Sequence, residues 1–234
     1  MPAVEFICLA NSTKLGEHCV AGIRTDGQGW IRPTGARHDG AVTHAEAACE
    51  DGSLPRILDV LRVDLEAPQP RCHQPENWRC SSGPHCTWRR VREANSSDIR
   101  VLMSQVQRGP HLLGDSGKSL AYGVLEARPA MASLALVEPQ SLRWEAKRWS
   151  SDEPLRAEAD LLLAGHRYWL KVTDPAWKGR IIALEEGLHT SQDLGVNTDT
   201  HRVLLTISLS EPYSRHGEPP HCWKLVAGVV VVPK

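Results

Sequence analysis

Residues 74–78 carry the densest set of side chains that could recognise a ligand. Within five positions they place two amides, a carboxylate and an indole, at Gln74, Glu76, Asn77 and Trp78. Amides and carboxylates hydrogen-bond the edges of bases or a sugar, and an indole stacks on an unpaired base. The same composition is typical of a polar turn anchored by a packed tryptophan, so both interpretations stay open.

Basic and aromatic residues alternate in a second segment. Arg167, Trp169 and Lys171 are each separated by one residue, so a β-strand would present all three on one face. A strand face of cation, indole and cation can follow a phosphate backbone and stack bases. Trp30 and Arg32 form an earlier pair of the same kind. The alternative for the strand face is a buried tryptophan beneath solvated charges, and the alternative for Arg32 is an ion pair with Asp39.

A cluster of thiols and imidazoles raises the question of zinc. Cys72, His73, Cys80, His85 and Cys86 lie within fifteen positions. Structural zinc sites usually present cysteine pairs separated by two residues, whereas the spacings here are irregular and no such pair occurs in the chain. We therefore predict no structural metal and no cofactor.

Residues 114–119 contain Gly-Asp-Ser-Gly-Lys-Ser, which resembles two known catalytic motifs in isolation. A serine protease has a further glycine where Lys118 stands. A phosphate-binding loop needs a glycine where Leu112 stands. We predict a flexible turn here.

The elements that must position these residues are mostly strands. Short β-type runs bounded by Gly, Pro, Asn and Asp recur along the chain. The predicted strands are residues 4–9, 19–24, 29–32, 57–65, 133–137, 166–172, 180–184, 203–209 and 223–232. Helices are expected at residues 97–107 and 155–163. Strands and helices do not alternate regularly, so we predict an all-β fold with minor helix.

The two ends of the chain echo each other. Residues 7–12 and 18–23 contain a strand, a polar loop, His-Cys and Val-Ala-Gly, and residues 207–212 and 221–229 repeat that order. Duplication of a small barrel would explain the echo, and chance matching of short strands is the alternative. We predict two small β-barrels in tandem with superposable end hairpins. The predicted domains are residues 1–128 and 129–234.

Composition narrows the classes of function. The chain has 27 Lys and Arg against 28 Asp and Glu, so a nucleic-acid partner must use a local patch rather than a global basic field. No apolar run approaches the roughly 20 residues of a membrane span. Strand-like residues follow Met1 directly, without a secretion signal, and the seven cysteines favour reduced thiols. We expect a cytoplasmic protein with no membrane partner.

Seven short segments, in order, resemble the dual OB-containing domain family of bacteria. They are residues 7–14, 19–23, 29–33, 74–77, 172–175, 207–212 and 224–227. The resemblance covers nearly the whole chain and implies two OB-like barrels. It also implies a nucleic-acid-recognition module linked to bacterial conflict and defence systems.

Together, the residues and the resemblance predict a module that binds single-stranded nucleic acid or a nucleotide in an OB groove. A protein of the same defence system is a further expected partner. The predicted contacts are Asn11, Ser12, Lys14, Trp30, Arg32, Gln74, Glu76, Asn77, Trp169, Lys171, Asp174 and Lys224.

No catalytic residue is predicted, and two alternative functions stay open. One is an enzyme acting on a nucleotide or modified base, with Glu76 or Asp174 as the general base. The other is a protein–protein adaptor, because near-zero net charge and abundant tryptophan also suit a protein interface.

Overall fold

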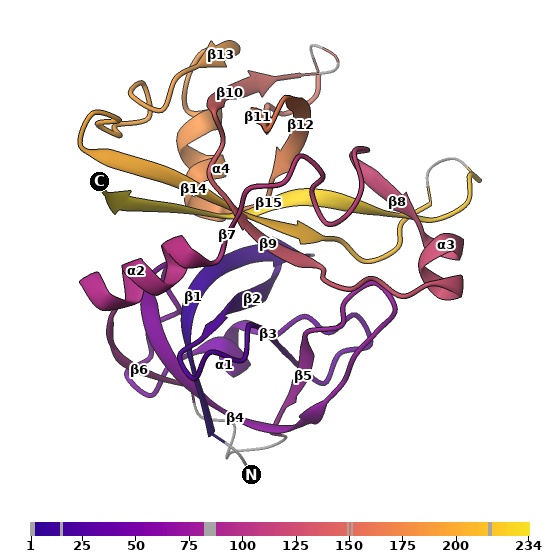
Figure 1. The fold of residues 1–234 in the computed structure, drawn as a ribbon. Coiled ribbons are helices and arrows are strands. Elements are labelled where there is room, and N and C mark those ends of the chain that lie inside the picture. The colour runs from indigo at the N-terminus through magenta and orange to yellow at the C-terminus, as the bar shows by residue number, and fades with distance from the viewer. Residues whose placement is uncertain (1–2, 15, 82–87, 149, 151, 215–216) are drawn as a thin grey trace.

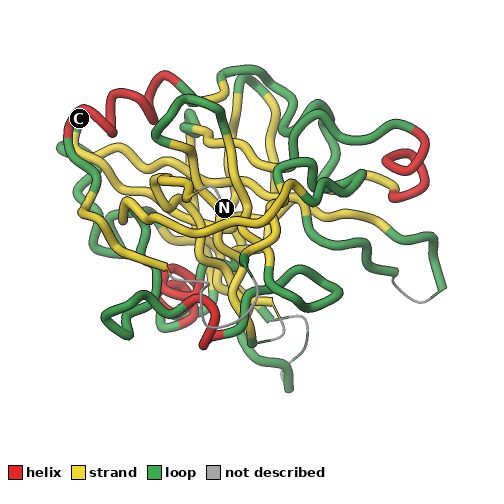
Figure 2. The backbone as a smooth tube through the Cα atoms, turned by 90° about the horizontal axis from the view of Figure 1, so that it is seen from below, coloured by secondary structure: helices red, strands yellow, loops and turns green. Residues whose placement is uncertain are grey.

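The computed structural model describes residues 3–14, 16–81, 88–148, 150, 152–214 and 217–234. Over these ranges the chain forms fifteen strands and four helices. Strands fill the middle of the molecule and the short helices lie outside them (Figures 1 and 2). Across the same ranges, none of the helices has the length and apolar character needed to cross a membrane.

The first unit is a closed five-stranded barrel, in the lower half of Figure 1. Its strands pair in the order β1-β2-β3-β5-β4, and β4 returns to β1. The pair β3–β5 is parallel and the other pairs are antiparallel. The strands are β1 (Ala3–Lys14), β2 (Glu17–Arg24), β3 (Trp30–Thr34), β4 (Asp59–Pro68) and β5 (Asn77–Cys80), with α1 (His44–Ala47) between β3 and β4.

The second unit repeats this strand order in the upper half of Figure 1. Its strands pair in the order β10-β11-β12-β15-β14, with a parallel pair β12–β15 and a helix, α4, between the third and fourth strands. These elements are β10 (Ser141–Lys147), β11 (Arg156–Leu163), β12 (His166–Val172), α4 (Pro175–Ile182), β14 (His201–Leu209) and β15 (His221–Pro233). The shared order and the closed first barrel confirm the predicted fold class of two OB-like units.

Additional elements join and flank the two units. The second barrel would close if β14 paired with β10, as β4 pairs with β1 in the first unit. Instead, β14 pairs with β9 and β10 pairs with β13. The strand β7 pairs with β9, β8 pairs with β15, and β6 pairs with β4. These elements are β6 (Trp88–Glu93), α2 (Ser96–Ser104), β7 (Val106–Gln107), β8 (Ser119–Ala121), α3 (Tyr122–Ala127), β9 (Leu134–Val137) and β13 (Gly187–His189). The predicted division after residue 128 stays a prediction, and β7 and β8 precede it although they pair with second-unit strands.

The two units share a hydrophobic core along β1 and β15. Ile7 and Leu9 of β1 belong to one buried cluster with Leu204 of β14 and Val230 of β15. The backbones approach so closely that a Cβ added to Gly228 would overlap the carbonyl oxygen of Leu9. Glycine has no Cβ, which makes this approach possible. We call this shared contact the seam.

The segment after Asp174 differs from its predicted structure. The predicted strand at residues 180–184 is wrong, because residues 175–182 form α4. The Asp174 carboxylate accepts hydrogen bonds from the backbone N–H groups of the first helical turn, and Pro175 occupies that turn. An aspartate cap followed by proline is a strong helix start.

The predicted helix at residues 155–163 is also wrong, because residues 156–163 form β11. Ala157, Ala159, Leu161 and Leu163 are all buried at every second position. This period of two outweighs the helix propensity of alanine and leucine. The predicted helix at residues 97–107 is confirmed over Ser96–Ser104, but its end is wrong because Val106–Gln107 form the strand β7.

The echo between the chain ends does not reflect equivalent hairpins. The hairpin β1–β2 supplies the first and second strands of its barrel, whereas β14–β15 supplies the fourth and fifth. Their registers also differ, since Gly22 lies opposite Cys8 but Gly228 lies opposite Thr206. The prediction that these hairpins superpose is therefore wrong, although the two units do share one strand order.

Candidate nucleic-acid interface

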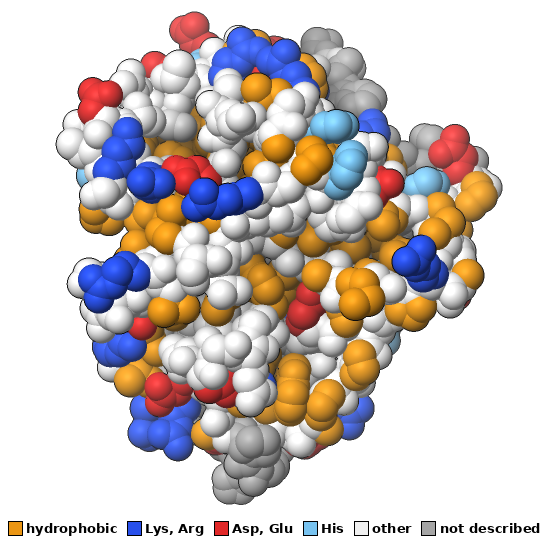
Figure 3. Space-filling model, in the orientation of Figure 1, with side chains coloured by type: hydrophobic (Ala, Val, Ile, Leu, Met, Phe, Trp, Pro, Cys, Tyr) orange, Lys and Arg blue, Asp and Glu red, His pale blue; other side chains and the backbone are white. Residues whose placement is uncertain are grey.

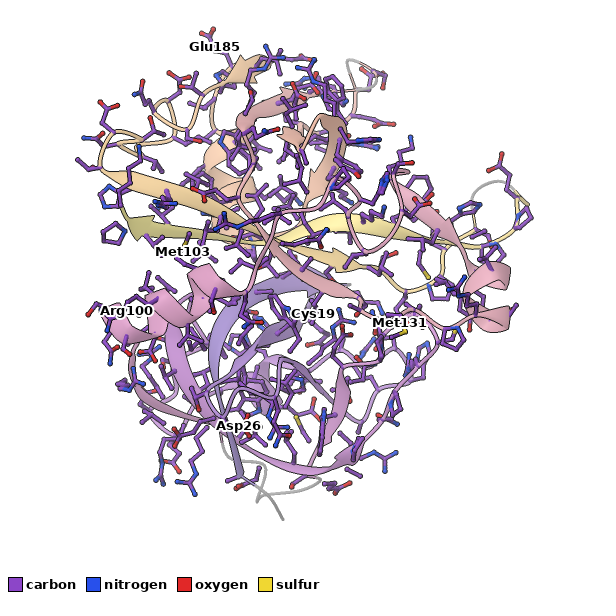
Figure 4. All side chains as sticks on the ribbon, viewed as in Figure 1. Cys19, Asp26, Arg100, Met103, Met131 and Glu185 are labelled. Atoms are coloured by element: carbon purple, nitrogen blue, oxygen red, sulfur yellow. The ribbon has the colours of Figure 1, made fainter. Side chains whose placement is uncertain are left out.

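A cleft of about 790 Å³ opens where the two units meet. This volume falls within the roughly 300–1,000 Å³ of typical ligand sites. The first unit contributes β2, β3 and the loop before β5. The second unit contributes the equivalent strands β11 and β12 and the loop before β15. OB folds bind oligonucleotides on these strands and flanking loops. The faces that bind ligands in OB folds therefore converge here on one cleft, which Cys19, labelled in Figure 4, helps to line.

The cleft is basic although the chain is nearly neutral. Of the described residues that line it, seven are Lys or Arg and three are Asp or Glu. Trp169, Tyr213 and Trp223 add aromatic rings. Elsewhere, on the face drawn in Figure 3, basic and acidic side chains are interspersed. The basic residues of the cleft are Lys14, Arg32, Lys118, Lys147, Arg156, Lys171 and Lys224.

Side chains of the first unit that reach β14 form the floor of the cleft. Arg32 is only 7% exposed and donates from Nη2 to the Ser208 hydroxyl at 3.0 Å. Its Nη1 has no hydrogen-bond partner among the described residues, and burial lowers the pKa of the guanidinium. Gln74 donates from Nε2 to the Leu209 carbonyl at 3.1 Å. The predicted contacts Arg32 and Gln74 therefore lie together at the bottom of the cleft.

Of the remaining polar residues of the 74–78 segment, Glu76 links the first unit to Ser133 and Asn77 braces Gln74 within the segment. The Glu76 carboxylate accepts hydrogen bonds from the Ser133 N–H at 2.7 Å and from the Ser133 hydroxyl at 2.6 Å. Asn77 is buried and donates from Nδ2 to Gln74 Oε1 at 3.2 Å. Neither Glu76 nor Asn77 is among the described residues that line the cleft.

The strand β12 forms one wall of the cleft. Arg167, Trp169 and Lys171 point to one face while Tyr168 and Leu170 are buried, as their alternation predicts. Trp169 is 44% exposed, and the Arg167 guanidinium lies 4.7 Å from its ring centroid. The indole thus keeps part of its surface exposed to the cleft.

Asp160, on the neighbouring strand β11, holds the arginine beside this indole. It lies opposite Trp169 and accepts hydrogen bonds from Arg167 at 2.7 Å and from Arg143 at 2.9 Å. Burial opposes ionisation of Asp160, but the two guanidinium groups hold its pKa below the usual value.

An ion network forms the rim between the loops of the two units. Lys14 donates to the Asp39 carbonyl at 3.1 Å and lies 3.8 Å from the Glu211 carboxylate. Glu211 also lies 3.2 Å from Arg71 and 3.2 Å from His73. Burial raises the pKa of Glu211, but these partners outweigh it and lower the pKa overall. Lys14 therefore lines the cleft with its charge shared among carboxylates, and Ser12 lines the cleft nearby on β1.

Lys224 lines the cleft, but its ammonium group is hydrogen-bonded to a loop. Its side chain is buried, and its ammonium donates to the carbonyl of Asp115 and, at 2.7 Å, to that of Gly117. Burial lowers its pKa. The turn predicted at residues 114–119 is therefore fastened to β15.

Three other predicted contacts lie outside the set of described cleft-lining residues. Asp174 caps α4 and accepts a hydrogen bond from the Val229 N–H at 3.0 Å, and burial raises its pKa. Asn11 donates to the Pro55 carbonyl at 2.8 Å. Trp30 packs against the seam.

Several cleft residues were not predicted as contacts. Lys147 and Arg156 flank the first loop of the second unit, the position that Lys14 holds in the first unit. Lys118 belongs to the segment predicted as a turn, and its Nζ lies 5.5 Å from the Trp223 ring centroid. Ser208 and Glu211 fall within the 207–212 segment that carries the family resemblance, which was the available signal.

The candidate zinc ligands do not assemble in the described part of the chain. Cys80 is buried in the core of the first barrel, while the Cys72 sulfur lies 3.8 Å from His73 Nδ1. His85 and Cys86 lie outside the described residues. Among the residues that the structure does describe, no group of three or more His, Cys, Asp and Glu side chains is arranged to hold a metal.

Comparison with known families gives one match. A family model described as a dual OB-containing domain matches residues 4–229. Searches of curated proteins and of solved structures returned no match.

Proposed function

Because the chain belongs to the dual OB-containing domain family, we propose that it binds single-stranded nucleic acid in the cleft between its two units. The observation that carries this proposal is the convergence of both OB ligand faces on one basic, indole-bearing cleft. Lys171 is positioned to attract phosphates and Trp169 to stack a base. Lys14 and Lys147, in contrast, line the cleft with their charges paired to carboxylates.

Unpaired strands are preferred for two reasons. Stacking on Trp169 requires a base whose face is free, which a duplex does not present. On the face drawn in Figure 3 basic residues are interspersed with acidic ones, and the net charge of the chain is -1, so a duplex outside the cleft gains little electrostatic attraction.

The enzyme alternative receives no support from its two candidate bases. The Glu76 carboxylate is bound to Ser133, and the Asp174 carboxylate caps α4. Neither belongs to the described lining of the cleft. The proposed role as an accessory of a bacterial defence system, and the proposed cytoplasmic location, are supported only by the family resemblance and by the sequence.

Fluorescence anisotropy tests the proposal with labelled single-stranded DNA, single-stranded RNA and duplex DNA of one sequence, across a salt series. We expect tighter binding of a single strand than of the duplex. The logarithm of affinity should fall with the logarithm of salt concentration, by about 0.7 per phosphate contact. Absence of binding at low salt would overturn the proposal and favour the adaptor.

A further inference from the structure

Arg32 is a buried cation with unused hydrogen-bonding capacity. It lines the cleft, is 7% exposed, and has Nη1 unpaired among the described residues. Its one side-chain partner, the Ser208 hydroxyl, is neutral. A guanidinium that leaves water without a full set of partners is unfavourable to the fold. Such a group is expected where a ligand supplies the missing partner.

The nearby carboxylates are bound to other groups. Glu76 and Glu211 are close enough to Arg32 to influence its ionisation. Glu76 holds the N–H and hydroxyl of Ser133, and Glu211 interacts with Lys14, Arg71 and His73. Among the described residues, neither carboxylate accepts a hydrogen bond from Arg32, so Nη1 is left for an acceptor from outside the chain.

Hydrogen bonds between the two units lie around Arg32 at the floor of the cleft. The Arg32–Ser208 and Gln74–Leu209 hydrogen bonds cross from the first unit to β14, and the Glu76–Ser133 bonds cross beside them. The Arg32–Ser208 bond holds the guanidinium at the floor, where a phosphate that ends a strand has chain on one side only and so fits more easily than an internal one.

We infer that the floor of the cleft binds a phosphomonoester, the phosphorylated end of a single strand, through Arg32. This inference rests on the proposed function and names the part of the ligand that reaches the floor. A terminal phosphate carries about 1.5 to 2 negative charges and three oxygens at neutral pH. An internal phosphodiester carries one charge and continues on both sides. The planar guanidinium fork matches the paired oxygens of a phosphate.

The test compares one single-stranded oligonucleotide with a 5′-phosphate, with a 3′-phosphate and without either, at one salt concentration. We expect one phosphorylated form to bind about tenfold tighter than the unphosphorylated strand, because hydrogen bonds to charged groups are strong. The position of the phosphate in the tighter-binding form identifies which end of the strand enters the cleft. Inorganic phosphate should weaken the binding of this form more than the binding of the unphosphorylated strand.

Arg32→Met separates a binding role from a structural one. We expect this variant to lose the preference for the phosphorylated end, to lose less affinity for the unphosphorylated strand than for the phosphorylated one, and to unfold at the same or a higher temperature. The matched control is Arg202→Met, which removes an arginine that pairs with Glu138 on the surface and should leave the preference unchanged.

The outcomes separate the two proposals. If unphosphorylated strands bind and phosphate at neither end tightens binding, the inference fails and the proposed function stands. If no strand binds in any form at low salt, the proposed function fails first. Retention of the preference in Arg32→Met overturns the assignment to Arg32. A lower unfolding temperature for Arg32→Met overturns it as well, because it would show that the guanidinium stabilises the fold.

Discussion

The first barrel closes because β4 pairs with β1, whereas in the second unit β9 and β13 pair with the two strands that would have met. The edge of β14 that β9 occupies extends the second sheet over the first barrel. Leu136 of β9 and Leu204 of β14 pack there against Ile7 and Leu9 of β1. The strand β9, which takes the place of barrel closure in the second unit, thus adds to the seam between the two units.

The two units also present different side chains to the cleft. The first contributes buried groups at the floor, such as Arg32 and Gln74, while the second contributes exposed groups on the wall, such as Trp169. Buried groups are fixed by hydrogen bonds between the units, so their positions depend on the seam. Exposed groups depend mainly on their own strand. Four substitutions test this difference.

Gly228→Ala should have the largest effect, because its Cβ would overlap the Leu9 carbonyl and force β1 and β15 apart. We expect the free energy of unfolding to fall by about 3 kcal/mol. Urea denaturation measures the change. The control is Gly179→Ala in α4, where no atom lies within 4 Å of the added Cβ and alanine favours the helix. Equal stability of Gly228→Ala and the parent would show that the seam tolerates separation.

Glu76→Ala should have the next largest effect, since it leaves the buried Ser133 N–H and hydroxyl without their acceptor. We expect a loss of about 2 kcal/mol in the free energy of unfolding. Glu138→Ala removes a carboxylate from a surface ion pair with Arg202 and should cost less than about 1 kcal/mol. Similar losses in both variants would contradict a bracing role for Glu76.

Trp169→Ala should weaken binding without destabilising the fold, because this indole is exposed on the wall. Loss of one stack is expected to cost about 1–3 kcal/mol of binding free energy. Trp30→Ala provides the contrast, since Trp30 packs against the seam and should reduce thermal stability more than affinity for an oligonucleotide. Anisotropy measures the affinity and thermal melts measure the stability. If Trp30→Ala lost affinity and Trp169→Ala lost stability instead, the stacking surface would lie on the first unit.

Lys171→Gln should have the smallest effect, a change in salt dependence. Removing one phosphate contact is expected to reduce the slope of log affinity against log salt by about 0.7. Lys178→Gln in α4 changes the net charge equally from outside the described cleft lining. If both variants change the slope alike, net charge rather than a contact governs the attraction.

Local patterns account for the parts of the molecule that the sequence predicted. Recurrent β-type runs indicated the all-β class, and alternation placed Arg167, Trp169 and Lys171 on one face of β12. A strand has a period of two wherever it sits, so this prediction needed no knowledge of the neighbouring strands. The similarity between the chain ends predicted two units, which is correct, but from hairpins that are not equivalent. Short strand motifs do not specify their place in the strand order.

The sequence by itself thus determined the all-β class, the face of β12 and the need of any nucleic-acid partner for a local basic patch. Only the tertiary structure decided which polar residues line the cleft, which link the two units and which cap a helix. Arg32 and Ser208 are 176 residues apart in the chain, and Glu76 and Ser133 are 57 apart. Asp174 likewise became a helix cap that also holds Val229. Such roles depend on which surface the second unit covers, and no local spacing of residue types encodes that contact.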